Sequence, residues 1–240
     1  MKKSVLIVLL AVILFLFGVI LLAKAIAGEK LFSATGKISI SAPYVSETTG
    51  EYVSSGMVTQ PNVTITHTKS KISLTALAII TSDSVKEVDL LLEKTLEIKG
   101  ATVTGGIGIY DVERIGNVDG DFFAVYANID FPEFLGIIPF LYVESNTPIR
   151  EEFGEGGVLW KTGIKKNLKI TEQPIDLKLE VGGNDGIYGS APMPVAFARG
   201  IISAEINLGK LKVIPSLTIQ KGFGGIAEEE RVILGISIPF

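Results

Sequence analysis

The sequence contains no cysteine and only one histidine, His67. The absence of cysteine excludes disulfide bonds, thiol nucleophiles, iron–sulfur clusters and thiolate metal sites. A single histidine excludes sites built from several imidazole ligands and restricts a Ser-His-Asp triad to His67. The enzyme classes that remain use carboxylate pairs or a Ser/Lys arrangement. We therefore expect no catalytic activity, with a carboxylate-based hydrolase of the cell envelope as an alternative.

Positive charge is also scarce, because 22 lysines and arginines stand against 26 aspartates and glutamates, for a formal net charge of −4. Nucleic acids and anionic lipid surfaces are bound by clustered basic residues. The composition therefore argues against a nucleic-acid partner.

One long apolar run is present at residues 5–23, VLIVLLAVILFLFGVILLA, and it holds no charged residue and no proline. At a helical rise of about 1.5 Å per residue the run matches the roughly 30 Å hydrocarbon core of a bilayer. Lys2 and Lys3 precede it and favour a cytoplasmic N-terminus. Residues 1–30 are therefore predicted to be a transmembrane anchor or signal segment that attaches the chain to the cell membrane through residues 5–23. The domain then lies outside the cell, and it is secreted or held at the surface if cleavage occurs near Ala27.

The rest of the chain reads as short strands. Between residues 62 and 68 Val63 and Ile65 alternate with threonines, and residues 88–98 alternate apolar and acidic side chains more regularly than they follow a helical period. Residues 43–61 are rich in Ser, Thr and Gly and are predicted to be a loop or stalk. Strand signals separated by Gly, Pro and Asn indicate an all-β domain over residues 31–240. We expect a jelly-roll-like antiparallel β-sandwich preceded by the N-terminal helix.

Two short motifs could carry a ligand or a modification. Asn117, Asp119 and Asp121 place hard oxygen ligands at alternate positions around Gly120, as a Ca²⁺ loop requires, but the bidentate glutamate that closes such a loop is missing. A hairpin turn explains the same residues. We expect no other cofactor. Asn62 begins an N-glycosylation sequon, Asn62-Val63-Thr64, in a region predicted to be exported.

The last ten residues support a different fold. Val232, Leu234, Ile236 and Ile238 share one face of a strand that ends in Phe240. This segment resembles the closing strand of outer-membrane β-barrels, which commonly ends in phenylalanine. Pro239 departs from that pattern, as does an aromatic content of 8%. The resemblance implies a small outer-membrane β-barrel as the alternative.

Residues 31–40, LFSATGKISI, follow the hydrophobic leader and resemble the start of mature camelysin/TasA-like fibre subunits and of some archaeal filament proteins. The resemblance implies that this segment, once freed by cleavage, could complete the sheet of a neighbouring subunit. The leading hypothesis is a membrane-tethered structural or interaction protein of the cell envelope, in its sharper form a self-assembling surface-filament subunit. Its partners are then other envelope proteins or further copies of the chain.

Overall fold

A computed structural model describes residues 31–45, 52–81, 85–111, 122–149, 156–170, 173–186, 192–224 and 230–240. Within these ranges the chain forms strands and turns and no helix. None of the described residues belongs to a helix of sufficient length and apolarity to cross a membrane. The apolar run at residues 5–23 and the candidate Ca²⁺ loop at residues 117–121 lie outside the described residues.

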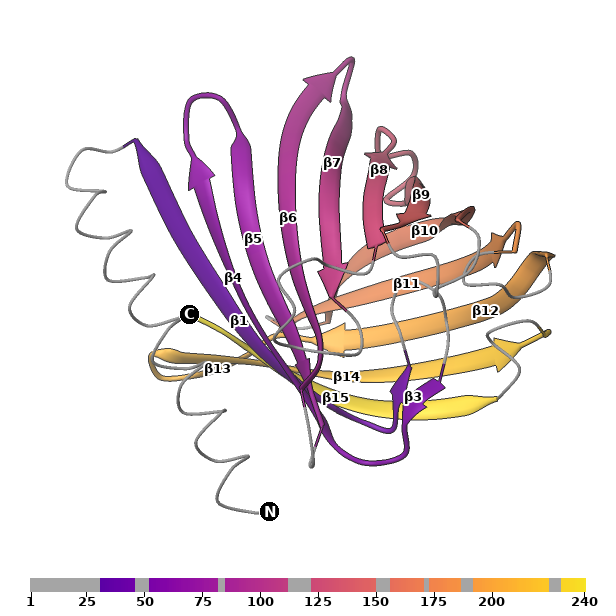
Figure 1. Cartoon of the computed structure of the whole chain (residues 1–240). Coiled ribbons are helices and arrows are strands. Elements are labelled where there is room, and N and C mark those ends of the chain that lie inside the picture. The colour runs from indigo at the N-terminus through magenta and orange to yellow at the C-terminus, as the bar shows by residue number, and fades with distance from the viewer. Residues whose placement is uncertain are drawn as a thin grey trace.

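Twelve strands of the described chain form a closed antiparallel β-barrel (Figure 1). In order around the ring they are β1 (Phe32–Ala42), β4 (Val58–His67), β5 (Ile72–Ile80), β6 (Val85–Ile98), β7 (Ala101–Asp111), β8 (Phe122–Asp130), β9 (Ile138–Pro148), β10 (Gly157–Ile170), β11 (Gln173–Asn184), β12 (Met193–Ala204), β14 (Leu211–Gly222) and β15 (Arg231–Pro239). The ring closes because β15 pairs with β1, and Figure 1 shows the first and last strands side by side. Two short strands, β2 (Tyr44–Val45) and β3 (Tyr52–Ser54), pair with each other, and β13 (Ile206–Leu208) pairs with β14.

The predicted β-sandwich with an N-terminal helix is therefore wrong. A sandwich has two sheets with free edge strands, whereas every strand of this ring has hydrogen-bonded neighbours on both sides. The decisive contact joins Ile38 of β1 to Ile238 of β15, two residues at opposite ends of the chain. Alternation within each strand is the same in a sandwich and in a barrel, so the local pattern could not distinguish them.

The outer face of the barrel is apolar. Leu74, Leu92 and Ile107 lie opposite one another on β5, β6 and β7 and are 50%, 46% and 43% exposed. Their strand neighbours Ser73 and Glu93 point inward because successive side chains of a strand alternate between faces. Leucine, isoleucine, valine and phenylalanine residues on the other strands continue this exposed surface. An outward apolar band around a polar interior is the pattern of transmembrane β-barrels.

The inner face is polar. Pairs of hydroxyl side chains face each other across neighbouring strands and hydrogen-bond at 2.8–3.0 Å. These pairs are Thr64–Thr75, Thr66–Ser73, Thr95–Thr104 and Ser39–Ser237. The barrel thus reverses the usual distribution of a water-soluble protein, in which the apolar face is the buried one.

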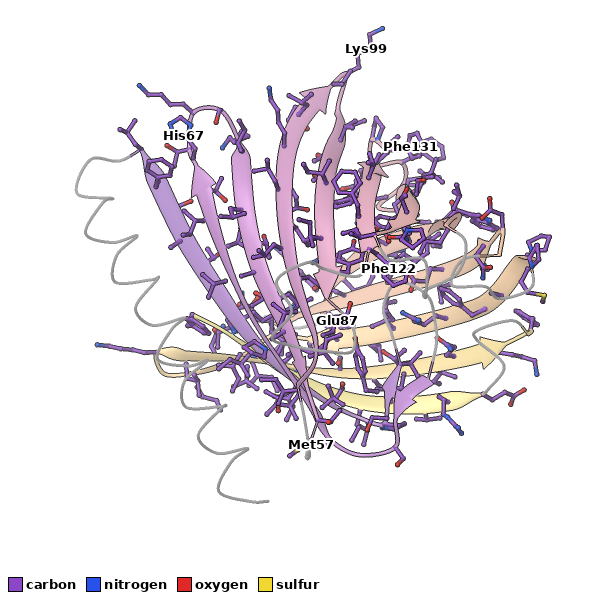
Figure 2. The ribbon with its side chains drawn as sticks, in the orientation of Figure 1. Met57, His67, Glu87, Lys99, Phe122 and Phe131 are labelled. Carbon is purple, nitrogen blue, oxygen red and sulfur yellow. The ribbon has the colours of Figure 1, made fainter. Side chains whose placement is uncertain are left out.

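The two rims of the barrel differ in the length of their connections. Figure 2 places His67 and Lys99 at one rim and Met57 at the other. At the first rim the strands are joined across residues 68–71, 99–100, 131–137, 171–172 and 209–210; at the second the connections span residues 43–57, 81–84, 112–121, 149–156, 185–192 and 223–230. Short turns at one rim and longer loops at the other are typical of outer-membrane barrels.

Gly36 and Phe240 complete the seam between the first and last strands. Each donates its backbone N–H to the carbonyl oxygen of the other, at 2.9 Å in both directions. A Cβ atom on Gly36 would collide with the ring of Phe240, so the close approach requires glycine here. Pro239 is the last residue of β15 and does not prevent closure. The resemblance of residues 231–240 to a closing strand is thus confirmed at the level of the fold.

The strand-donation hypothesis is not supported. β1 pairs with β4 along Phe32–Ser41 and with β15 along Lys37–Ala42, so both of its edges are already used within its own barrel. A donated strand would need at least one free edge. The segment predicted as a loop or stalk, residues 43–61, contains β2, β3 and the start of β4.

The predicted localisation, a domain outside the cell membrane on a single-pass helix, is also wrong. The exposed outer face described above is suited to contact with lipid rather than water. The prediction assumed that the apolar side of each strand is buried in a core. In a barrel of this kind the apolar side faces outward, and the strands themselves carry the membrane-contacting surface.

Candidate functional site: the barrel interior

Charged residues in the interior are separated into two arcs by the strand register. The inward positions of β6 and β9 carry acidic residues, namely Glu87, Asp89, Glu93, Glu97 and Glu144. The inward positions of β10, β11, β12, β15 and β1 carry basic residues, namely Lys161, Lys165, Lys178, Arg199, Arg231 and Lys37. Within the described parts of β5 to β8, no inward position holds a lysine or arginine. The interior therefore has one acidic side and one mainly basic side.

Arg199 is the centre of a buried polar network on the basic side. Its side chain is 3% exposed and lies 3.3 Å from Oε1 of Glu180, which is 1% exposed. Nε and Nη2 of Arg199 donate to Oε1 of Gln220 at 3.0 and 2.7 Å, and Lys178 lies 2.6 Å from the other Glu180 oxygen. Glu180, Arg199 and Gln220 occupy directly opposed positions on β11, β12 and β14. The register alone brings these three together.

Glu144 is the centre of a second network on the acidic side. It is fully buried, and its Oε2 accepts hydrogen bonds from the hydroxyls of Tyr110, at 3.0 Å, and Tyr142. Asn146 Nδ2 donates to Oε1 at 2.7 Å. A buried carboxylate must have such partners, because an unpaired charge in this position is costly.

Replacing Glu144 by alanine is expected to lower the free energy of unfolding by about 3 kcal/mol, because three buried donors lose their acceptor. Glu144→Gln keeps one acceptor oxygen and should cost clearly less. Urea titration of the folded barrel in detergent micelles, followed by the fluorescence of Trp160, measures both variants. Equal losses for the two would contradict the assigned role of the carboxylate.

Lysines of the basic side lie over aromatic rings of β9. Lys165 and Lys178 are 5.1 and 4.8 Å from the ring centre of Phe140, and Lys161 is 4.5 Å from that of Tyr142. Lys165 also pairs with Asp130 on β8 at 2.6 Å. These contacts hold the long side chains against the wall rather than across the interior.

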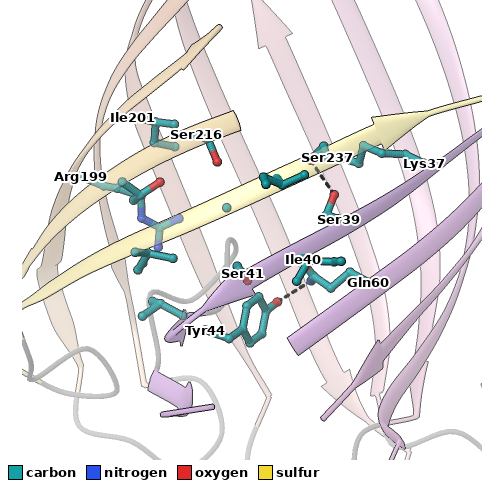
Figure 3. A pocket seen from close by; sticks show the side chains of 15 residues that line it. Lys37, Ser39, Ile40, Ser41, Tyr44, Gln60, Arg199, Ile201, Ser216 and Ser237 are labelled. Carbon is teal, nitrogen blue, oxygen red and sulfur yellow. Dashed lines mark hydrogen bonds between the residues drawn. The ribbon is translucent and has the colours of Figure 1, made fainter. Parts of the chain in front are cut away.

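The β2 segment closes part of the interior from the long-loop side. Tyr44 and Val45 are buried, and Tyr44 packs against Val58 and Ile79, which occupy inward positions. The Tyr44 hydroxyl accepts a hydrogen bond from Gln60 Nε2 at 2.8 Å (Figure 3). Between this segment and the wall formed by β1, β12, β14 and β15 lies a cavity of about 120 Å³.

The residues singled out from the sequence lie apart from these networks. Asn117, Asp119 and Asp121 are outside the described residues, so Ca²⁺ binding stays a prediction. In the described part of the chain no group of three or more His, Asp or Glu side chains is placed to hold a metal ion. Asn62 occupies an inward position of β4, opposite Lys37 and Leu77, and its glycosylation also stays a prediction.

His67 belongs to the turn at the short-turn rim. Its Nδ1 lies 2.7 Å from the Ser70 hydroxyl, and its ring contacts Phe32 edge to face. Glu144, Arg199 and Glu180 were missed by sequence reasoning. The available signal was the placement of charged residues at alternate positions within otherwise apolar strands, as in residues 175–181.

No protein-family model matches the sequence, and no curated protein matches it. Solved structures do match. A KdgM porin has a TM-score of 0.55 and 6% identity, over 87% of this chain and 99% of that chain, and a KdgM porin in complex with disordered oligogalacturonate gives the same values. A NanC porin has a TM-score of 0.54 and 7% identity over the same shares. At such low identity the likeness concerns the fold alone. The chain has the porin-like fold of an outer-membrane β-barrel.

Proposed function

We propose that the protein is a non-enzymatic pore that passes small hydrophilic solutes across an outer membrane. The observation that carries the proposal is the reversed polarity of the barrel, apolar outside and charged inside. Charged residues facing a lumen have a role where water and polar solutes pass, and they would be costly in a dry core.

The width of the barrel supports passage of small solutes. Barrels of about 8 strands are filled by their own side chains, whereas those of about 16–18 strands leave an aqueous channel. Twelve strands lie between these limits. The similar solved structures are porins, and one of them contains an acidic oligosaccharide by its title. They favour a channel over an enzyme.

The proposal predicts stepwise conductance when the full chain is reconstituted into planar lipid bilayers in KCl. Glu93→Gln should lower the preference for K⁺ over Cl⁻, seen as a shift of the reversal potential in a KCl gradient, because Glu93 faces the lumen. Lys94→Gln is the matched control, because Lys94 is its direct neighbour and points outward. Absence of conductance from folded protein would overturn the proposal. Equal shifts for both variants would show that the current does not pass through this lumen.

A further inference from the structure

The cavity beneath Tyr44 has an unusual lining. Its fifteen lining residues include the cations Lys37 and Arg199 and no aspartate or glutamate (Figure 3). Most of the remaining polar groups are hydroxyls of serine, threonine and tyrosine, with the amide of Gln60. Such a lining offers many hydrogen-bond donors and a positive potential.

The charges around the cavity do not cancel. Glu180 is paired with both Lys178 and Arg199, so that this network of three keeps one positive charge. No hydrogen-bond or ion-pair partner for Lys37 is found among the residues that the structure describes. The cavity is therefore electropositive, and Lys37 is the cation able to take a new partner.

A second observation points to a ligand. The hydroxyl of Ser41 is shielded from solvent and has no hydrogen-bond partner in the described part of the chain. Ser41 and Lys37 lie on the same inward face of β1. Buried hydroxyls are normally satisfied, and this one lies beside a space large enough to hold a small molecule.

We propose that this cavity is a binding subsite for a small carboxylate that carries hydroxyl groups. The carboxylate pairs with Lys37, in the field of Arg199, and the hydroxyls exchange hydrogen bonds with Ser41 and with Gln60. Tyr44 covers the bound molecule from the long-loop side. The volume of about 120 Å³ restricts the occupant to a few carbon atoms. The subsite rests on the proposed pore function, since it lies within the lumen.

The test is equilibrium binding of D-glycerate to the full chain in detergent micelles at low ionic strength, with neutral glycerol as the matched probe. Wild type should bind glycerate and not glycerol. Lys37→Gln should weaken glycerate binding about tenfold through loss of a charge-assisted hydrogen bond, and Ser41→Ala should weaken it less. Lys69→Gln removes the same charge from an exposed turn and should bind like wild type. A heat-dependent mobility shift confirms that each variant is folded.

The subsite is overturned if folded Lys37→Gln binds glycerate as well as wild type, if Lys69→Gln loses as much, or if glycerol binds equally. Conductance of the same preparations separates this result from the fate of the proposed function. A pore that conducts without binding glycerate refutes the subsite alone. Glycerate binding that depends on Lys37, in a barrel that does not conduct, supports the subsite and refutes the pore.

Discussion

Replacing Arg199 by methionine is expected to lower the free energy of unfolding by about 3–5 kcal/mol, the usual cost of removing one partner from a buried ion pair. Arg199 and Glu180 are almost completely buried, and Gln220 also loses its donor. Lys178 remains beside Glu180, but its side chain is 31% exposed and cannot replace the guanidinium on the other oxygen. Urea unfolding of the barrel in phospholipid vesicles, followed by Trp160 fluorescence, gives the loss.

The double variant Arg199→Met/Glu180→Leu is the control for this interpretation. Replacing a whole buried pair by apolar residues of similar volume is often close to neutral. We expect the double variant to recover most of the stability that the single variant loses. If it is as unstable as the single variant, packing around Arg199 rather than its charge explains the effect.

Arginine at Leu92 is expected to cost about 2–4 kcal/mol in a lipid bilayer, the penalty measured for lipid-facing positions near the midplane of barrels. Leu92 lies near the middle of β6, between Leu74 and Ile107 on the outer face. A guanidinium there would have neither water nor a carboxylate within reach. The measurement is unfolding in vesicles of a lipid with known hydrocarbon thickness.

Thr95→Arg provides the comparison on the same strand. Thr95 points inward, toward Thr104, and its inward neighbours on β6 are Glu93 and Glu97. The new charge would then lie in water beside two carboxylates, so only the loss of one hydroxyl pair, about 1 kcal/mol, is expected. A larger loss for Thr95→Arg than for Leu92→Arg would mean that the inner and outer faces are assigned the wrong way round.

Much of the secondary structure could be read from the sequence. Residues 88–98 were ambiguous between helix and strand, and the more regular alternation correctly indicated a strand, which is β6. The apolar face of residues 231–240 and the terminal Phe240 indicated a closing strand, as β15 is. These features are local, because an alternation of period two is a property of one strand and needs no knowledge of its partners.

The interior networks could not be predicted in the same way. Glu180 is 19 positions from Arg199, and Arg199 is 21 from Gln220. They meet because three strands pair in one register, and a slip of one residue would turn each of them to the lipid side. Tyr44 and Gln60 also meet only because β2 turns back over the lumen.

By itself the sequence determined that the chain from residue 31 onward is built from strands with one apolar and one polar face. Only the tertiary structure decided that β1 pairs with β15, and hence that the polar face is enclosed and the apolar face exposed. The physical reason is that the period of the pattern is the same whether the apolar side meets another sheet or a lipid bilayer. Closure of the ring removes that ambiguity, because a single barrel has only one inside.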